Sequence, residues 1–441
     1  GSGQYRGGDY AQKPGHEVAH IGQYGRQKGI PTVFWNKEDP VHHQKFMGSA
    51  SQADYIFTTD ANMCDSYREQ TGNDHVYPLP FAAQPALHKP APLEGRKPRA
   101  CFAGSWYGNR HPERGEAMRW LLDAANEYGL DIYDRNYGTG VFPFPEEFHD
   151  GIQGSLPYKE LCDEYRRYRL FLNVNSVTDS PTMMSRRVFE LMGSGTPVVS
   201  TYARGIEEMF ESDAVWMVRS ADEAREAVRT LLEDDDEWRR RSLAGIREVF
   251  SRHTYAHRLN DILQRLGLGA ELPTEPELLL MARAASEGEV EALLDTVQRQ
   301  EYRNFRVLIE TAGYPAPGGA PEQVEFLEVP GLNDLDLAER SQGVAAMGWL
   351  SPQGKYGPLY LRDLVNAMLY QPEAEGWAKA LEADEYAFGQ RATLAGSLWR
   401  PEVFRARWQR AQPAHMLQEP NLFSIDSTEF SLARSQQVVE A

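Results

Sequence analysis

The sequence predicts an α/β protein with parallel sheets, divided into compact units. The first observation is length, since 441 residues suit two to four domains. The second is that short apolar runs alternate with helical stretches along most of the chain. The third is a pair of Pro-rich segments, 84–98 and 266–276, which are typical of linkers. We therefore expect units at 1–84, 99–268 and 277–441.

The first unit is expected to be small. Its apolar runs and helical patterns alternate in the manner of a parallel sheet with covering helices. The strands are expected at 30–35, 55–58 and 76–79, and the helices at 16–27, 41–50 and 62–70. Three strands are few for such a sheet, so either this lobe is short or strands that would precede it are missing.

The second unit repeats this alternation more fully and predicts a doubly wound domain. Strands are expected at 100–103, 130–133, 170–174, 197–200 and 215–218. Helices are expected at 112–128, 158–168, 181–192, 221–232, 237–252 and 256–266. Ligands of such domains bind outside the carboxyl ends of the strands. The loops after Ala103, Val174 and Ser200 are therefore the places to search for a site.

The third unit is again predicted to be α/β, with different spacing. Strands are expected at 278–282, 305–310, 324–329 and 344–349, and helices at 289–299 and 359–369.

Charge and composition exclude several classes of protein. The net charge is −18, from 46 basic and 64 acidic residues, which argues against a nucleic-acid-binding or anionic-membrane-binding protein. No apolar stretch approaches a membrane span, and the first residues do not resemble a signal peptide. The three cysteines form no Cys-x-x-Cys pair, so we expect neither a disulfide framework nor a zinc site. We also expect a cytoplasmic location, where thiols stay reduced.

The most informative stretch is 173–200. Ser180 is a good N-cap, Pro181 suits the first helical position, and Gly193 is expected to end the helix. The helix would then begin at the ligand-binding edge of the sheet. We expect free amide groups near Thr182 and Met183, which with the helix dipole favour a phosphate.

Three charged residues follow in this helix. Arg186 and Arg187 could form charge-assisted bonds to a diphosphate, and the carboxylate of Glu190 could accept two hydrogen bonds from a ribose diol. The alternative is an ordinary solvated face with i,i+3 and i,i+4 ion pairs. Spacing alone favours the solvated face and leaves both interpretations open.

The loop after the strand at 100–103 is a second candidate. Gly104 lets the backbone approach a ligand, and Ser105, Asn109 and Arg110 add polar groups on the correct edge. A plain surface turn explains the same residues equally well.

The loop at 34–43 contains ionisable residues that could supply a general base. Glu38, Asp39, His42 and His43 are the candidates. The alternative is a surface loop in which Asp39 caps a helix beginning at Pro40.

One string fits the zinc-protease pattern His-Glu-x-x-His. It runs from His16 to His20, with Glu17 as the candidate base. The pattern is short and a third ligand must come from elsewhere. We therefore expect no metal site, and keep a zinc hydrolase only as an alternative.

These motifs together resemble a known bacterial family. The segments 30–40, 102–105, 180–200 and 253–258 look like the CgeB-like spore-maturation glycosyltransferases, over roughly residues 20–268. The resemblance implies a GT-B fold of two Rossmann-like lobes. It implies transfer of a sugar from a nucleoside diphosphate sugar, most simply a UDP-sugar, to an acceptor hydroxyl without a metal or other cofactor.

The resemblance also assigns roles. Glu190 matches the ribose-binding glutamate, Arg186 and Arg187 match the basic pair, and Gly104-Ser105 match the loop below the diphosphate. The first lobe would bind the acceptor and supply the base. Many retaining relatives have a second glutamate eight positions before the ribose glutamate, where this chain has Thr182. The first lobe is also shorter than that of complete GT-B proteins.

The third unit resembles a degenerate GT-A glycosyltransferase domain. Residues 348–353, where such enzymes carry Asp-x-Asp, contain no carboxylate, and hard divalent cations need oxygen ligands. Asp334 and Asp336 form an Asp-x-Asp string that is expected to begin a helix instead. We expect a silent module that packs, forms a homo-oligomer or binds a partner. The alternative for the whole chain is a non-catalytic nucleotide-sugar-binding or scaffold protein.

Overall fold

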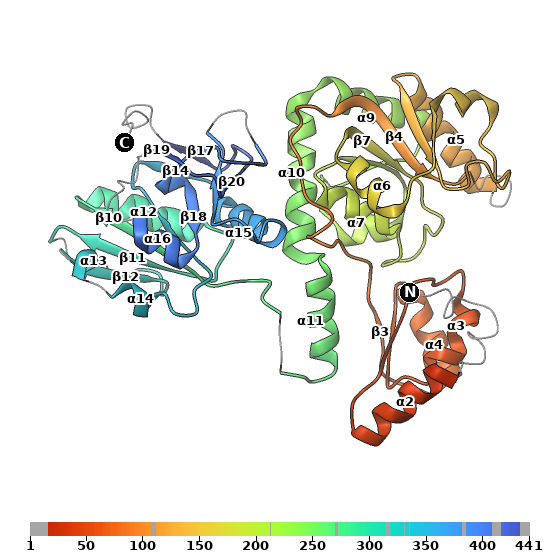
Figure 1. Cartoon of the computed structure of the whole chain (residues 1–441), viewed down its shortest axis with the longest axis horizontal. Coiled ribbons are helices and arrows are strands. Elements are labelled where there is room, and N and C mark those ends of the chain that lie inside the picture. The colour runs from red at the N-terminus through yellow and green to blue at the C-terminus, as the bar shows by residue number, and fades with distance from the viewer. Residues whose placement is uncertain are drawn as a thin grey trace. The chain divides into compact units, whose positions relative to one another are not determined.

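The chain divides into two compact units, residues 1–272 and 273–441, which are described separately (Figure 1). The structure is a computed structural model. It describes residues 16–106, 112–211, 213–269, 272–313, 318–329, 331–334, 336–381, 385–407 and 416–432.

The first unit begins with a small parallel sheet of order β1-β2-β3. Ile56, Val76 and Tyr67 form its buried core with Ala50 and Cys64. The strands are β1 (Val33–Asn36), β2 (Tyr55–Thr58) and β3 (Val76–Pro78). The helices are α2 (His16–Lys28), α3 (His43–Ala50) and α4 (Cys64–Thr71), with the short η2 (Ala61–Met63) before α4. The predicted strand–helix alternation and parallel pairing are confirmed.

A second, six-stranded sheet follows in the same unit, with all neighbours parallel and the order β6-β5-β4-β7-β8-β9. The strands are β4 (Lys97–Gly104), β5 (Leu130–Asp134), β6 (Ile152–Gly154), β7 (Tyr168–Asn173), β8 (Val198–Thr201) and β9 (Trp216–Val218). The predicted doubly wound sheet is confirmed, except that β6 was not expected because its three residues, Ile-Gln-Gly, carry no strand pattern.

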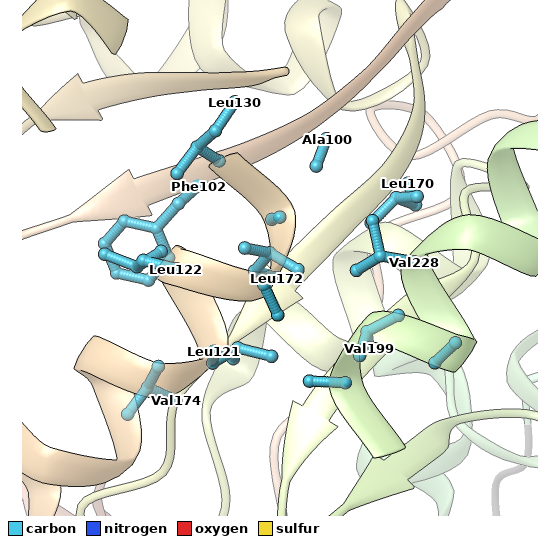
Figure 2. Packing of buried hydrophobic residues seen from close by; sticks show 14 of the residues in the cluster. Ala100, Phe102, Leu121, Leu122, Leu130, Leu170, Leu172, Val174, Val199 and Val228 are labelled. Carbon is cyan, nitrogen blue, oxygen red and sulfur yellow. The ribbon is translucent and has the colours of Figure 1, made fainter. Parts of the chain in front are cut away.

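Helices cover both faces of this sheet. The helices α5 (Pro112–Asn126) and α9 (Ala221–Glu233) pack on one face. Figure 2 shows Leu121 and Leu122 of α5 and Val228 of α9 against strand residues such as Leu172. The opposite face is covered by α6 (Tyr158–Tyr165), α7 (Arg186–Gly193), α8 (Arg204–Met209) and α10 (Asp235–Arg252).

The spacing of apolar residues explains why these helices pack as they do. In α9 the buried residues Ala224, Ala227, Val228 and Leu231 recur at helical intervals, so one stripe faces the sheet. Burying a side chain the size of leucine stabilises the fold by roughly 2 kcal/mol. The Ser220 hydroxyl accepts a hydrogen bond from the Glu223 amide and so fixes where α9 begins.

The chain passes between the two sheets twice, and the two passages are bonded to each other. The Ala83 amide donates to the His253 carbonyl at 2.9 Å, and the Tyr255 amide donates to the Ala83 carbonyl at 3.1 Å. Next to them, α11 (Tyr255–Arg265) carries the buried Arg258, whose Nη2 donates to the Phe81 carbonyl at 3.1 Å. Burial lowers the pKa of Arg258 to about 10.

The C-terminal unit, residues 273–441, has an eight-stranded mixed sheet of order β12-β11-β10-β13-β18-β15-β20-β16. The strands are β10 (Leu278–Ala284), β11 (Phe305–Thr311), β12 (Val324–Glu328), β13 (Ala346–Trp349), β15 (Gly376–Lys379), β16 (Ala387–Phe388), β18 (Ser397–Trp399) and β20 (Leu422–Ile425). Its longer helices are α12 (Glu287–Arg299) and α15 (Tyr360–Tyr370). The predicted opening strand–helix–strand is confirmed.

Two details bear on the chemistry expected of this unit. Asp336 caps α14 (Leu337–Arg340) by accepting from the Ala338 and Glu339 amides, as expected, whereas Asp334 is the last residue of α13 (Gly331–Asp334). Lys379 is completely buried and pairs with Asp363 at 2.6 Å and Asp426 at 3.0 Å, so its charge is balanced inside the core.

Among the residues described, none of the helices is both apolar enough and long enough to cross a lipid bilayer.

Candidate functional site

The candidate site lies where β7 and β8 end and α7 begins. Amide and hydroxyl groups tie the two strand ends together: Asn173 Nδ2 donates to Ser200 Oγ at 2.9 Å, and Asn175 Nδ2 donates to the Thr201 carbonyl at 2.8 Å. All four residues are buried. This network fixes the start of the loop that leads to α7, at the sheet edge where parallel α/β sheets bind ligands.

The helix begins later than the sequence predicts. It starts at Arg186 rather than at Pro181, because the Ser180 hydroxyl accepts hydrogen bonds from the Thr182 amide at 3.3 Å and the Met183 amide at 3.0 Å and so forms a turn. The prediction of free amides at Thr182 and Met183 is therefore wrong. Contact between these residues and a donor stays a prediction.

Glu190 lies buried in a cluster of phenols and one guanidinium. Its Oε1 accepts from the Tyr158 hydroxyl at 2.6 Å and pairs with Arg186 Nε at 2.6 Å, and its Oε2 accepts from the Tyr165 hydroxyl at 3.0 Å. Burial is the main cause that raises the pKa of the Tyr158 phenol, and the negative charge of Glu190 raises it further. Both tyrosines therefore stay neutral and act as hydrogen-bond donors.

The remaining capacity of Glu190 can be counted. A carboxylate offers about four acceptor positions, and three are occupied by Tyr158, Tyr165 and Arg186. One position is left on Oε2. A ribose diol needs two, so it binds Glu190 in full only after the Arg186 guanidinium or one phenol moves away.

The two arginines differ in their surroundings. Arg186 is 48% exposed, pairs with Glu190 and stacks 4.9 Å above the Tyr158 ring. In Arg187 the Nε is buried without a hydrogen-bond partner, although its guanidinium interacts with the Tyr165 hydroxyl. In the described ranges no carboxylate forms an ion pair with Arg187. A buried guanidinium nitrogen without an acceptor is suited to an anionic ligand.

The loop after β4 is described only in part. Ser105 is buried and its hydroxyl accepts from Asn136 Nδ2 at 3.0 Å. A Cβ added to Gly104 would lie 3.0 Å from the Phe102 ring, so packing on that ring already explains the glycine. Asn109 and Arg110 lie outside the described residues, and their predicted contact with the donor stays a prediction.

Asp39 is not placed as an accessible base. It is fully buried, and its carboxylate meets Asn36 Nδ2 at 2.8 Å, His43 Nδ1 at 3.1 Å, the Thr58 hydroxyl at 2.6 Å and the Tyr67 hydroxyl at 3.0 Å. Burial raises the pKa of Asp39, and these bonds oppose the rise. It does not cap a helix either, since α3 begins at His43. Asp39 instead fastens the loop to β2 and α4.

Other residues of this loop remain accessible. Glu38 is exposed and His42 is half-buried, whereas His43 is buried and its Nε2 lies 2.9 Å from the Ser66 hydroxyl. Lys37 belongs to the run of ionisable residues expected at 34–43, but no role of its own was predicted for it. Its Nζ lies 4.1 Å from the Trp35 ring centroid and 5.0 Å from that of Tyr255 on α11.

Lys37 connects this loop to the candidate site. Desolvation is the main cause that lowers the pKa of Lys37, and the positive charge of Arg186 lowers it further. A cation close to Arg186 adds positive potential near α7. Its position next to these residues could not be predicted, because Tyr255 and Arg186 are distant from it in the chain.

In the described part of the chain, no group of three or more His, Cys, Asp or Glu residues could hold a metal ion. His20 is exposed on α2, and the side chains of His16 and Glu17 lie outside the described residues. Cys64, Cys101 and Cys162 are free and buried.

Comparison with known proteins gives one family. Residues 110–264 match the family model described as glycosyl transferase-like, which is less than half of the 441 residues. The matched range contains α6 and α7 with Arg186, Arg187 and Glu190. This part of the chain is similar to glycosyltransferases. No curated protein matches the chain.

Solved structures show distant similarity. TarM has 11% identity over 54% of this chain and 50% of its own, with a TM-score of 0.37. HepE of Anabaena in complex with UDP and glucose has 13% identity, coverage of 57% and 75%, and a TM-score of 0.42. Sucrose-phosphate synthase from Thermosynechococcus elongatus has 13% identity, coverage of 57% and 72%, and a TM-score of 0.39. The chain thus spans half the length of TarM.

Proposed function

We propose that the protein is a glycosyltransferase that moves a sugar from a nucleoside diphosphate sugar to an acceptor hydroxyl. The observation that carries the proposal is the family match over residues 110–264, because that range includes the cluster of Arg186, Arg187 and Glu190 at a ligand-binding sheet edge. A hexose donor carried by UDP is the first to test. The CgeB-like family and the GT-B arrangement of lobes form part of this proposal.

The residues of the cluster suggest separate roles. The buried Nε of Arg187 has no acceptor and would bind a phosphate oxygen. Arg186 would leave Glu190 for the diphosphate, because its half-exposed side chain is held by a single carboxylate oxygen. That exchange would free a second acceptor position on Glu190 for the ribose diol.

The reaction then balances as a group transfer. The bond between the anomeric carbon and the diphosphate oxygen breaks, and the electron pair stays on the diphosphate, where the two arginines stabilise it. The acceptor oxygen forms the new bond to the anomeric carbon. Its proton passes to a base of the first lobe, and Glu38 and His42 are the candidates because both are more accessible than Asp39.

We further propose that the reaction needs no divalent cation, since guanidinium groups near α7 would balance the diphosphate charge. Turnover measured with EDTA and with added Mg²⁺ tests this directly, and strict dependence on Mg²⁺ would contradict it. The C-terminal unit, residues 273–441, is proposed to be a non-catalytic module that packs or forms a homo-oligomer. A cytoplasmic location is proposed from the free, buried thiols.

The experiment for the donor site compares two matched arginines. Arg186→Met removes an i,i+4 pair in which Nε lies 2.6 Å from Glu190 and the arginine is 48% exposed. Arg204→Met removes a pair on α8 with Nε 2.7 Å from Glu208 and the same exposure. We expect Arg186→Met to weaken UDP binding about tenfold or more, from the loss of a charged hydrogen bond, and Arg204→Met to leave it unchanged.

A thermal-shift screen should precede the variants. UDP-, GDP-, TDP- and ADP-sugars raise the unfolding midpoint only if they bind the folded chain, so the preferred donor is identified by the largest shift. If no nucleotide sugar shifts the midpoint, or if both arginine variants bind UDP like the wild type, the proposed donor site is wrong.

The second candidate is a nucleotide-sugar-binding protein without turnover. The engagement of Asp39 by four side chains favours it, because the first lobe then lacks its most obvious base. The two candidates differ in one measurement, the release of nucleoside diphosphate from a bound donor. Release at rates typical of enzymes excludes the binding protein.

A further inference from the structure

The loop that precedes α7 is bonded to the first lobe. The Ser180 hydroxyl donates to Asp60 Oδ1 at 2.6 Å. The Thr182 hydroxyl donates to the Thr59 carbonyl at 2.9 Å and accepts from the Ala61 amide at 2.9 Å. We call these five residues the interlobe clasp. Asp60 and Ser180 are 1% and 0% exposed, so the bond between them is shielded from water, whereas Thr182 and Ala61 are half-buried.

The Ser180 hydroxyl also shapes the loop. A hydroxyl has one proton to donate and two lone pairs to accept with. The proton goes to Asp60, and the lone pairs accept from the amides of Thr182 and Met183. All three capacities are used, so the bond to the first lobe and the turn before α7 form one hydrogen-bond network. Removing the Asp60 acceptor frees the hydroxyl to rotate and loosens the turn.

The other side of the loop is closely packed. A Cβ added to Gly205 on α8 would lie 3.2 Å from the Ser180 carbonyl oxygen and 3.4 Å from that of Met183. The buried side chain of Met184 belongs to the same core cluster as Val188 of α7. The loop is thus held by α8 and the core on one side and by the first lobe on the other. It leads directly into Arg186, the first residue of α7.

We propose that the interlobe clasp positions Arg186 and so couples docking of the first lobe to binding of a nucleoside diphosphate. This inference rests on the proposed function, since it assumes that Arg186 contacts the donor. Asp60, Ser180 and Thr182 are positioning residues and do not touch the donor themselves. When the lobes separate, the turn loses its anchor, Arg186 loses its fixed position, and affinity for the diphosphate falls.

The coupling has a thermodynamic consequence. A ligand that binds the docked form better than the open form shifts the population toward the docked form. We call the part of the chain around the six-stranded sheet, residues 99–268, the middle lobe. The donor would therefore draw the first lobe, with its candidate bases Glu38 and His42, onto the middle lobe before the acceptor reacts. Water would be excluded at the same step.

The test removes one hydroxyl and keeps the shape of the side chain. Thr182→Val loses both bonds of Thr182 to the first lobe, and Thr182→Ser keeps the hydroxyl. The matched control is Thr71→Val, because Thr71 also donates to a carbonyl, that of Tyr67 at 2.7 Å, and accepts from an amide, that of Asn73 at 3.2 Å, but entirely within the first lobe.

The readout is the dissociation constant of UDP by titration calorimetry at fixed salt. We expect about tenfold weaker binding for Thr182→Val, a value within about twofold of wild type for Thr182→Ser, and no change for Thr71→Val. Hydrogen exchange of the Ala61 amide, whose acceptor is the Thr182 hydroxyl, checks that this bond of the clasp is lost in Thr182→Val.

Each result decides a different statement. If Thr182→Val exchanges the Ala61 amide faster yet binds UDP like the wild type, the coupling is overturned while the donor site stands. If the wild type binds no nucleoside diphosphate, the proposed function is overturned, and this inference with it. If Thr182→Val fails to fold, Asp60→Ala replaces it because it removes the acceptor of the Ser180 hydroxyl, and unchanged UDP binding together with a faster Ala61 amide overturns the coupling.

Discussion

Asp39 of the first lobe and Glu190 of the middle lobe are both buried carboxylates, and both were predicted to belong to the site. Asp39 accepts from or pairs with four side chains, two on each oxygen. Glu190 has three such partners, and one of them, Arg186, is half exposed. The first carboxylate has therefore used its acceptor capacity, while the second retains one position and gains another when Arg186 moves.

The comparison shows that burial alone does not distinguish a structural carboxylate from a ligand-binding one. The number of partners, and whether any of them is free to leave, makes the distinction. All partners of Asp39 lie within the first lobe, so the network holds one small sheet and its helices together. The partners of Glu190 come from α6 and α7, next to a guanidinium nitrogen without an acceptor.

The largest effect is expected from Asp39→Ala. It leaves Asn36, Thr58 and Tyr67 without their acceptor inside the core, and we expect the first lobe to lose about 3 kcal/mol of stability. Hydrogen exchange of the amides of β2 measures this loss for that lobe alone. A variant that keeps its protection but loses turnover would instead make Asp39 the base.

A smaller effect, on binding, is expected from Glu190→Gln. The amide keeps one acceptor oxygen but lacks the charge that favours the ribose hydroxyls and pairs with Arg186. We expect UDP affinity to fall about tenfold, with little change in the exchange of core amides. Titration with UDP and with inorganic pyrophosphate separates the two contributions, because pyrophosphate has no ribose. Equal losses for both ligands would contradict the assignment of Glu190 to the ribose.

The smallest expected effect is the contribution of Asp39 to the pH dependence of folding stability. Its folded-state pKa is raised above the ordinary value of 3.8. The folded chain therefore holds a proton that the unfolded chain has released, and stability falls as pH rises from about 4 to the raised pKa. Asp39→Asn removes this term, so its unfolding midpoint relative to wild type should increase across that range. A constant difference between pH 4 and pH 7 would contradict the raised pKa.

The sequence predicted the elements of the fold better than the details of the site. Strands such as β2 and helices such as α9 follow from local apolar spacing, and both lie where they were expected. The start of α7 was misplaced because Ser180 and Pro181 form a good local helix start, whereas the partner of Ser180 is Asp60, 120 residues away. No local pattern contains that contact.

The same reason explains the residues that were missed. Arg186 and Glu190 were found because i,i+4 spacing places them on one side of a helix. Tyr158 and Tyr165, which donate hydrogen bonds to Glu190, lie on another helix. Aromatic residues in a helix usually indicate only packing. Lys37 contacts Tyr255 across the first unit. A pairing of this kind becomes visible only when the sheets are assembled.

The paired crossings at Ala83 and Thr254 limit how the two lobes of the first unit move. The two crossing segments are hydrogen-bonded side by side, and Arg258 also donates to the Phe81 carbonyl of the first segment. Sliding one segment along the other would break these bonds, whereas a bend about them would not. We expect the two lobes to move by a hinge rotation about these crossings. When the lobes open, Asp60 would separate from Ser180 while the crossings keep their hydrogen bonds. When the lobes close, the same two side chains would form their hydrogen bond again.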